Sequence, residues 1–203
     1  MSIIKLNNRS VKDATAFGSI SSLGSLTFIS KQTASSSATI SFTSGIDSTY
    51  KEYIFYFVNC HAASNNGHFS FQGSTDGGSS YGVTMTTTLF TALHAENASY
   101  AALDYDSGGD LAQSTNFQNL SRFTNNDSDS AVSGYLHLFN PSSTTFVKHF
   151  VSRISDIQNS SPNWSGDNFI GGYFNTTSAI DAIQFKFHNS NTDSGDIILF
   201  GLN

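Results

Sequence analysis

Short apolar stretches separated by polar turns make up most of the chain from residue 24 onward. In the segment 38–42 apolar residues alternate with hydroxyl-bearing ones, a period of two that is typical of a strand with one buried face. The segment 53–58 is apolar throughout, which favours a strand at the centre of a sandwich. No segment sustains the 3.6-residue period of a helix, so the pattern predicts strands only.

Turn-forming residues divide these stretches, with an Asp-Gly-Gly turn at 76–78 and an Asn-Pro turn at 140–141. The predicted strands lie at 26–29, 38–42, 53–58, 69–71, 81–90, 135–139, 146–154, 169–174, 180–187 and 197–202. The stretch 90–105 is expected to be a long connection that holds at most one helical turn. Regularly spaced short strands indicate an all-β fold, an antiparallel, jelly-roll-like β-sandwich over residues 24–203.

The first 23 residues differ from the rest, because they are polar and hold three of the nine Lys and Arg residues. A basic extension on an acidic body is typical of an interaction arm. Lys5, Leu6, Arg9 and Lys12 are therefore candidate anchoring residues of an extended N-terminal arm at 1–23. The alternative is an ordinary terminus without a function of its own.

Composition and charge exclude several classes of function. Nine Lys and Arg against fifteen Asp and Glu give a net charge of -6, whereas nucleic-acid binding needs a basic face, so no nucleic acid is expected as a partner. The apolar runs are too short to cross a bilayer, and the N-terminus has no apolar core of a signal peptide, so no membrane is expected either. The chain has a single cysteine and cannot form an internal disulfide.

Catalytic machinery is not apparent in the sequence. Cys60 and His61 are adjacent, but neighbouring side chains on a strand point to opposite faces, so the two are not expected to meet. None of the histidines has the spacing of a zinc motif. An enzyme and a cofactor are therefore not expected.

Two binding sites remain as candidates. Asp104, Asp106 and Asp110 surround a Gly-Gly pair and resemble a calcium loop, although they lack the full ligand set of an EF-hand and also suit a solvated turn. Aromatic residues in or near the predicted loops are candidates for stacking on sugar rings, with Asp76, Asp104 and Asp106 beside them; the alternative is packing at the edge of the core. These aromatic residues are Tyr81, Tyr100, Tyr105 and Trp164.

Turn-and-strand signatures along nearly the whole chain carry a resemblance to a known group of proteins. They lie at 21–26, 46–53, 71–81, 171–174, 179–183 and 194–201. Together they resemble small β-rich virion structural proteins, tail-fibre-like or head-decoration-like, of marine tailed phages and especially cyanophages. No catalytic residues come with this resemblance.

The resemblance implies a non-enzymatic virion protein that forms a surface appendage, knob, fibre or capsid decoration docked through its N-terminal arm. Such a protein is assembled in the host cytoplasm and released by lysis, which fits the missing signal peptide. The expected partners are further copies of the chain, as a homotrimer, and other virion proteins of the head or tail. The alternative is a carbohydrate-binding receptor-recognition module at a tail-fibre tip, with host surface glycan as its ligand.

Overall fold

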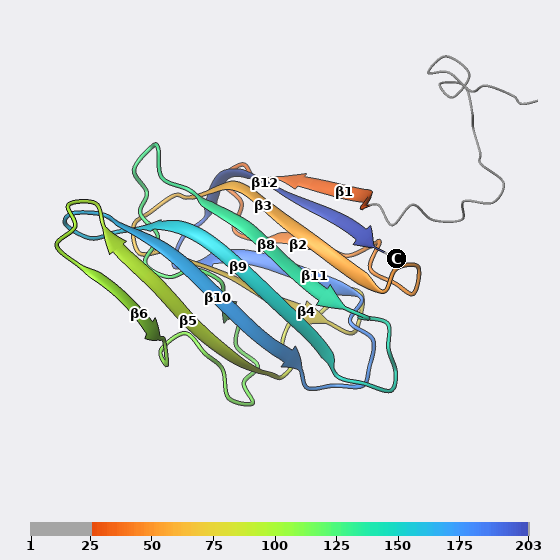
Figure 1. The fold of residues 1–203 in the computed structure, drawn as a ribbon. Helices are drawn as coiled ribbons and strands as arrows, with labels where there is room; N and C mark the ends of the chain where they lie inside the picture. The colour runs from red at the N-terminus through yellow and green to blue at the C-terminus, as the bar shows by residue number, and fades with distance from the viewer. Residues whose placement is uncertain (1–25, 203) are drawn as a thin grey trace, which may run out of the picture.

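A computed structural model describes residues 26–202 (Figure 1). The candidate anchoring residues Lys5, Leu6, Arg9 and Lys12 lie outside the described residues, so the arm hypothesis rests on the sequence alone. None of residues 26–202 lies in a helix, and this part of the chain therefore holds no helix that could span a membrane.

Two antiparallel sheets of unequal size form the fold (Figure 1). In spatial order the eight-stranded sheet contains β1 (Thr27–Thr33), β12 (Thr192–Leu202), β3 (Glu52–Ala62), β8 (Val132–Phe139), β9 (Lys148–Gln158), β10 (Trp164–Phe174), β5 (Met85–Ala95) and β6 (Ala101–Tyr105). The four-stranded sheet contains β2 (Ile40–Phe42), β11 (Ala182–His188), β4 (His68–Ser74) and β7 (Gln118–Asn119). The predicted all-β sandwich is confirmed, while this strand order does not establish the jelly-roll-like arrangement.

Aromatic side chains from both sheets fill the space between them. Phe55 and Phe57 of β3 meet Phe185 of β11 with ring centroids 5.2 Å apart in each pair, and Phe71 of β4 meets Phe150 of β9 at 5.0 Å. All five rings are at most 2% exposed. Edge-to-face pairs of this kind add to the burial of apolar area, so the many phenylalanines are what hold the two layers together.

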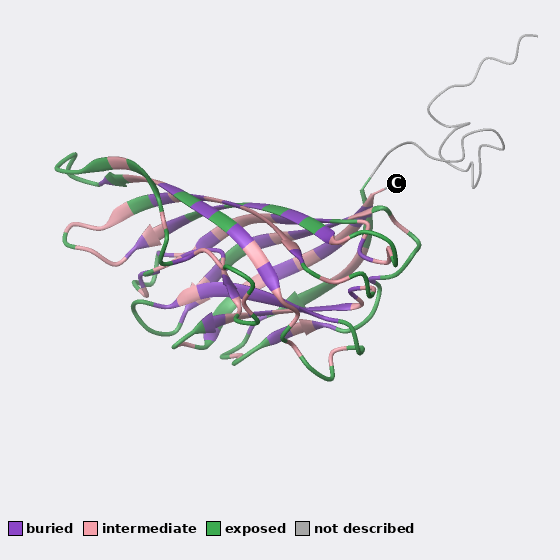
Figure 2. Cartoon of the chain, turned by 90° about the horizontal axis from the view of Figure 1, so that it is seen from below, coloured by how far each residue is buried: buried purple, intermediate pink, exposed green. Residues whose placement is uncertain are grey.

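Buried and more exposed positions alternate along β9 and most of β5, two strands of the larger sheet (Figure 2). The segment 53–58 forms part of β3, which lies inside the larger sheet between β12 and β8. Its apolar character predicts burial on both faces, but the inward face is buried more completely than the outward one. Among the described residues no second layer covers the outward side, where Tyr56 is partly and Val58 44% exposed.

The prediction for residues 90–105 was wrong, since this stretch forms the β5–β6 hairpin. β5 continues to Ala95 and pairs with all eleven residues of β10, and β6 begins at Ala101. The five alanines of this stretch have low strand propensity, which hid the hairpin from a pattern-based prediction. Pairing with β10 outweighs that local preference.

Candidate functional site

The outward face of the eight-stranded sheet, called the outer face below, carries a continuous row of side chains. One residue from each of the eight strands lies opposite its neighbour on the next strand. In order the row is Tyr105, Phe90, Phe169, Arg153, Tyr135, Tyr56, Ile198 and Lys31. Five of these eight are aromatic, and adjacent strands bring such neighbours within about 5 Å of each other.

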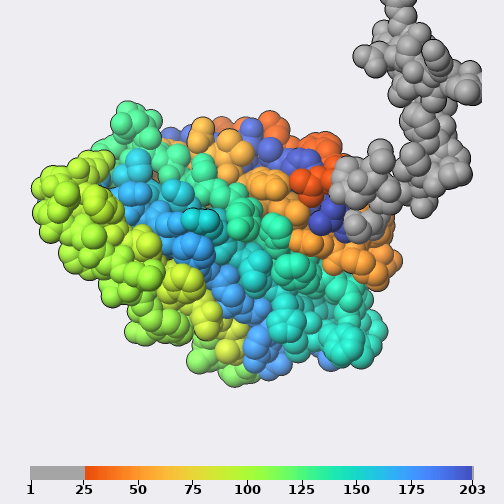
Figure 3. Space-filling view, in the orientation of Figure 1, coloured from red at the N-terminus to blue at the C-terminus, as the bar shows by residue number. Residues whose placement is uncertain are grey.

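Large apolar side chains are exposed on this face. Leu103 and Tyr105 of β6 are 70% and 57% exposed, and Phe28 of β1 is 60% exposed. Further exposed apolar side chains of the same face are Val58, Phe90, Phe139 and Val151. Figure 3, in which the outer face is turned toward the viewer, shows that segments from early and late parts of the chain contribute to one continuous surface. An exposed apolar patch of this extent is typical of an interaction site.

The aromatic rings of the row pack on one another. Phe90 and Phe169 are stacked with centroids 4.8 Å apart and planes 4° from parallel. The guanidinium of Arg153 lies 4.7 Å from the Phe169 ring centroid. Both neighbours cover Phe169, so its ring presents an edge rather than an open face. A sugar ring stacks on an open aromatic face, and this part of the row is therefore better suited to contact with another protein.

Charges on the outer face are compensated within it. Arg153 forms a two-pronged ion pair with Asp167, with its Nη2 and Nε at 2.7 and 3.0 Å from the carboxylate oxygens. Lys31 pairs with Asp196 at 3.1 Å. Glu52 contacts the ring of His137. Arg153 and Lys31 therefore present no uncompensated positive charge to a second surface of the same kind.

The aromatic residues proposed for glycan contact do not form one site. Tyr100 and Trp164 are stacked, with centroids 4.7 Å apart. Trp164 is five residues before Phe169 on β10, so the two side chains point to opposite faces of the sheet. Tyr105 is in the outer-face row, opposite Phe90. The stacked pair and Tyr105 thus lie on opposite sides of the larger sheet.

Tyr81 lies near the other end of β5, four residues before Met85, whereas Trp164 is paired with Ala95 at the far end. The hydroxyl of Tyr81 is buried and has no hydrogen-bond partner among the described residues. Nearby, the side-chain hydroxyls of Ser74 and Ser80 donate to the Asp76 carboxylate and lower its pKa to about 2. Asp76 and Tyr81 are thus at the opposite end of β5 from Trp164.

Two of the three carboxylates of the proposed calcium loop are engaged by other side chains. Asp106 accepts hydrogen bonds at 2.5 Å from Arg122, and Asp110 accepts one at 2.5 Å from the Tyr105 hydroxyl. Asp104 is on β6. Across residues 26–202 no three His, Cys, Asp or Glu side chains are grouped so that they could hold a metal ion. The calcium hypothesis therefore gains no support from this geometry.

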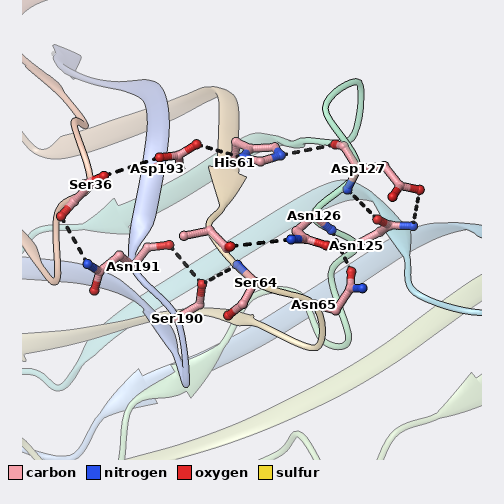
Figure 4. A network of polar contacts seen from close by, with 11 residues as sticks. Ser36, His61, Ser64, Asn65, Asn125, Asn126, Asp127, Ser190, Asn191 and Asp193 are labelled. Carbon is pink, nitrogen blue, oxygen red and sulfur yellow. Dashed lines mark hydrogen bonds and ion pairs between the residues drawn. The ribbon is translucent and has the colours of Figure 1, made fainter.

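Cys60 and His61 take separate places, as their adjacent positions on β3 predict. Burial raises the pKa of the Cys60 thiol to about 12, which makes it a poor nucleophile. His61 instead joins a network of polar contacts between loops at one end of the sandwich (Figure 4). Its ring lies 3.1 Å from the carbonyl of Asp127 and 3.5 Å from the carboxylate of Asp193.

The rest of this network ties four connections together (Figure 4). The backbone N–H of Ser64 donates to the Ser190 hydroxyl at 3.0 Å, and that of Asn126 donates to the Asn65 side chain at 2.9 Å. The Asn191 amide reaches the carbonyl of Ser36 at 3.2 Å. These contacts link loop to loop at this end of the sandwich.

In comparisons with known proteins, no family model, curated protein or solved structure matches the chain.

The outer-face row was missed at the level of sequence. Its signal is present, because aromatic residues occur at outward positions of several strands, such as Tyr56, Tyr135 and Phe169. Their alignment into one row depends on the register of seven strand pairings, which the sequence pattern does not give.

Proposed function

We propose that this protein is a non-enzymatic structural protein of a bacteriophage virion whose sandwich associates with a second copy through the outer face. The phage context comes from the resemblance in the sequence. The observation that supports self-association is the row of side chains across all eight strands, five of them aromatic, flanked by exposed apolar residues.

The area of this face suits a stable contact. Aromatic side chains bury about 150–250 Å² each, so seven large apolar side chains that are roughly half exposed offer on the order of 600 Å² per copy. Partly exposed members of the row, such as Tyr135 and Phe169, add to this figure. The total approaches the ~800 Å² that each partner contributes to an interface of standard size.

The chemistry of the face favours a second copy of the same chain over a charged partner. Arg153 and Lys31 are already neutralised by Asp167 and Asp196, so two such faces approach each other without uncompensated like charges. A face that contacts the same face of another copy has two-fold symmetry. The proposal is therefore a dimer in place of the homotrimer expected from the resemblance, with docking to other head or tail proteins occurring elsewhere on the chain.

Sedimentation equilibrium of the full chain tests this function. The wild-type protein is expected to dimerise with a Kd on the order of 1–10 µM. The double variant Leu103→Asn/Val151→Asn places two amides on the outer face and is expected to weaken dimerisation at least about tenfold. Phe146→Asn is the matched control, because Phe146 is 69% exposed but precedes β9 and lies outside the face.

Two results would overturn the proposal. One is a wild-type chain that stays monomeric at concentrations well above ~10 µM. The other is an oligomer, trimeric or otherwise, that the double variant leaves as stable as the Phe146→Asn control does.

The glycan-binding alternative gains nothing from the four aromatic residues that the sequence singled out, because they are dispersed over the molecule. A hollow against the four-stranded sheet, lined by other residues, supports saccharide binding instead.

A further inference from the structure

A hollow lies against the outward side of the four-stranded sheet. It measures about 610 Å³ and is bounded by β4, β11 and the loop that leads into β7. The strands supply His68, Lys186 and His188, and the loop supplies Asp110, Asn116 and Phe117. Its volume falls within the range of about 300–1,000 Å³ that is typical of small-molecule sites.

Strand alternation fixes one wall of this hollow. Phe69 of β4 and Phe185 and Phe187 of β11 point into the core, so the residues between and beside them point outward. His68 and His188 are paired in register at one end of these strands, with ring centroids 6.4 Å apart. The wall therefore consists of side chains held by a rigid sheet rather than by a mobile loop.

Buried amides hold the opposite wall in place. The side-chain amide of Gln72 donates to the carbonyls of Thr115 and Asn116, each at 3.0 Å, and that of Gln118 donates to the carbonyl of Gly109 at 2.9 Å. Gln72 and Gln118 are fully buried. Two points of the loop are thus fixed to the sheet beneath it, which preorganises the hollow.

Several polar side chains around the hollow have unused hydrogen-bonding capacity. Lys186 places its ammonium 4.0 Å from the Phe117 ring centroid and donates no hydrogen bond to a described residue. The side chains of Asn116 and Asn119 and both histidine rings likewise make no hydrogen bond within residues 26–202. Asp110 uses one carboxylate oxygen for the Tyr105 hydroxyl and leaves the other available.

The chemistry of this lining indicates the class of ligand. The amides supply donors and acceptors together, and one ammonium is balanced by one carboxylate. Burial and the nearby Arg122 lower the pKa of His68, so its ring is neutral at pH 7 and offers both a donor and an acceptor. A compact ligand with many hydroxyl groups and no net charge matches such a set better than an anion or an apolar molecule.

We propose that this hollow binds a neutral saccharide unit, whose hydroxyl groups hydrogen-bond to Asn116, Asn119, Lys186 and Asp110. The site does not depend on dimerisation, because the outer face lies on the other sheet of the sandwich. It shares no residue with the aromatic glycan site expected from the sequence.

Titration of the full chain with single sugars, followed through the histidine ring resonances by NMR, tests this proposal. The probes are the methyl glycosides of glucose, galactose and mannose, with glucuronate as the charged comparison. At least one neutral glycoside is expected to shift the His68 and His188 signals saturably, with a Kd on the order of 1–10 mM. Lys186→Met and Asn116→Ala are each expected to weaken this binding about tenfold.

Lys51→Met serves as the matched control, since Lys51 is an exposed lysine away from the hollow and its loss is expected to leave the titration unchanged. The proposal is overturned if no neutral glycoside shifts these signals at concentrations up to about 50 mM. Saturable binding of glucuronate alone, or binding that both hollow variants leave intact, overturns it as well. The outer-face variant Leu103→Asn/Val151→Asn is expected to bind sugar normally, so failure of the dimer and failure of the sugar site are distinguishable.

Discussion

Asp156 has an unusual environment for an aspartate, because its carboxyl group is buried. It points into the sandwich from β9, is 3% exposed, and neither carboxylate oxygen has a well-aligned hydrogen-bond partner among the described residues. Burial raises its pKa from the ordinary value of 3.8 to about 7, although the nearby Asn168 and Gln158 amides oppose this shift. The folded state therefore prefers the protonated form of this side chain.

This shift makes the stability of the protein dependent on pH. Because the pKa is higher in the folded than in the unfolded state, the stabilisation is complete below pH 4 and is lost as the pH rises through 7. Over that window the free energy of unfolding is expected to fall by up to about 4 kcal/mol. Asp156→Asn should remove this slope and be the more stable protein at pH 8.

Urea unfolding at pH 4, 6 and 8 measures this dependence of the free energy of unfolding on pH. Asp129→Asn is the control, because Asp129 is exposed. Equal pH slopes in the wild type and in Asp156→Asn would show that the carboxyl is not protonated in the fold.

The single cysteine gives a second prediction at this scale. The Cys60 thiol is fully buried and its pKa is raised to about 12 by that burial, so almost no thiolate is present at pH 8. We expect a disulfide reagent that reports released thiolate to react negligibly with the native chain and fully in urea. Rapid reaction of the native protein would mean that β3 opens readily at this position.

At the scale of the element, alternation along single strands was predictable, while the partners of each strand were not. The all-apolar segment 53–58 correctly indicated a strand inside a sheet. The β5–β6 hairpin was missed because its stability comes from pairing with β10 rather than from local propensity. Trp164, expected in or near a loop, is the first residue of β10 and directly follows the loop at 159–163.

A tight contact between β12 and β3 gives a prediction for a glycine. The register between these strands shifts on either side of Ser194, and Gly195 has a φ of +115°. A Cβ at this position would lie 2.5 Å from the carbonyl oxygen of Asn59. Gly195→Ala is therefore expected to lower the free energy of unfolding by about 1–3 kcal/mol.

The same urea experiment applied to Gly82→Ala supplies the comparison, because a Cβ at Gly82 meets no atom within 4 Å. That variant should change the free energy of unfolding by less than about 0.5 kcal/mol. If the two variants lose equal stability, the close approach of β12 to β3 is not a constraint on the fold.

At the scale of the whole molecule, the sandwich has two outward sides with different chemistry. The larger sheet presents the aromatic outer face, and the smaller sheet carries the polar hollow. Neither could be predicted from the sequence, because each is assembled from distant segments. His68, Asn116 and Lys186 meet only after β4 and β11 have paired and the loop has been fixed by Gln72.

Under the two proposals above, each side of the sandwich has a separate task. The outer face, with its compensated charges and exposed apolar rings, is suited to protein contact, and the hollow is suited to a small polar ligand. A virion protein with both properties would assemble through one side and remain free to bind saccharide with the other.

Hydroxyl-radical footprinting of the full chain above and below the dimerisation Kd tests the central claim most directly. Leu103, Phe28 and Tyr105 should be oxidised several-fold more slowly at the higher concentration, because a second copy covers them. Phe146, which is as exposed as Leu103 but lies outside the outer face, should react equally at both concentrations. Equal oxidation of the outer-face residues at both concentrations would contradict the claim that this face is the contact between copies.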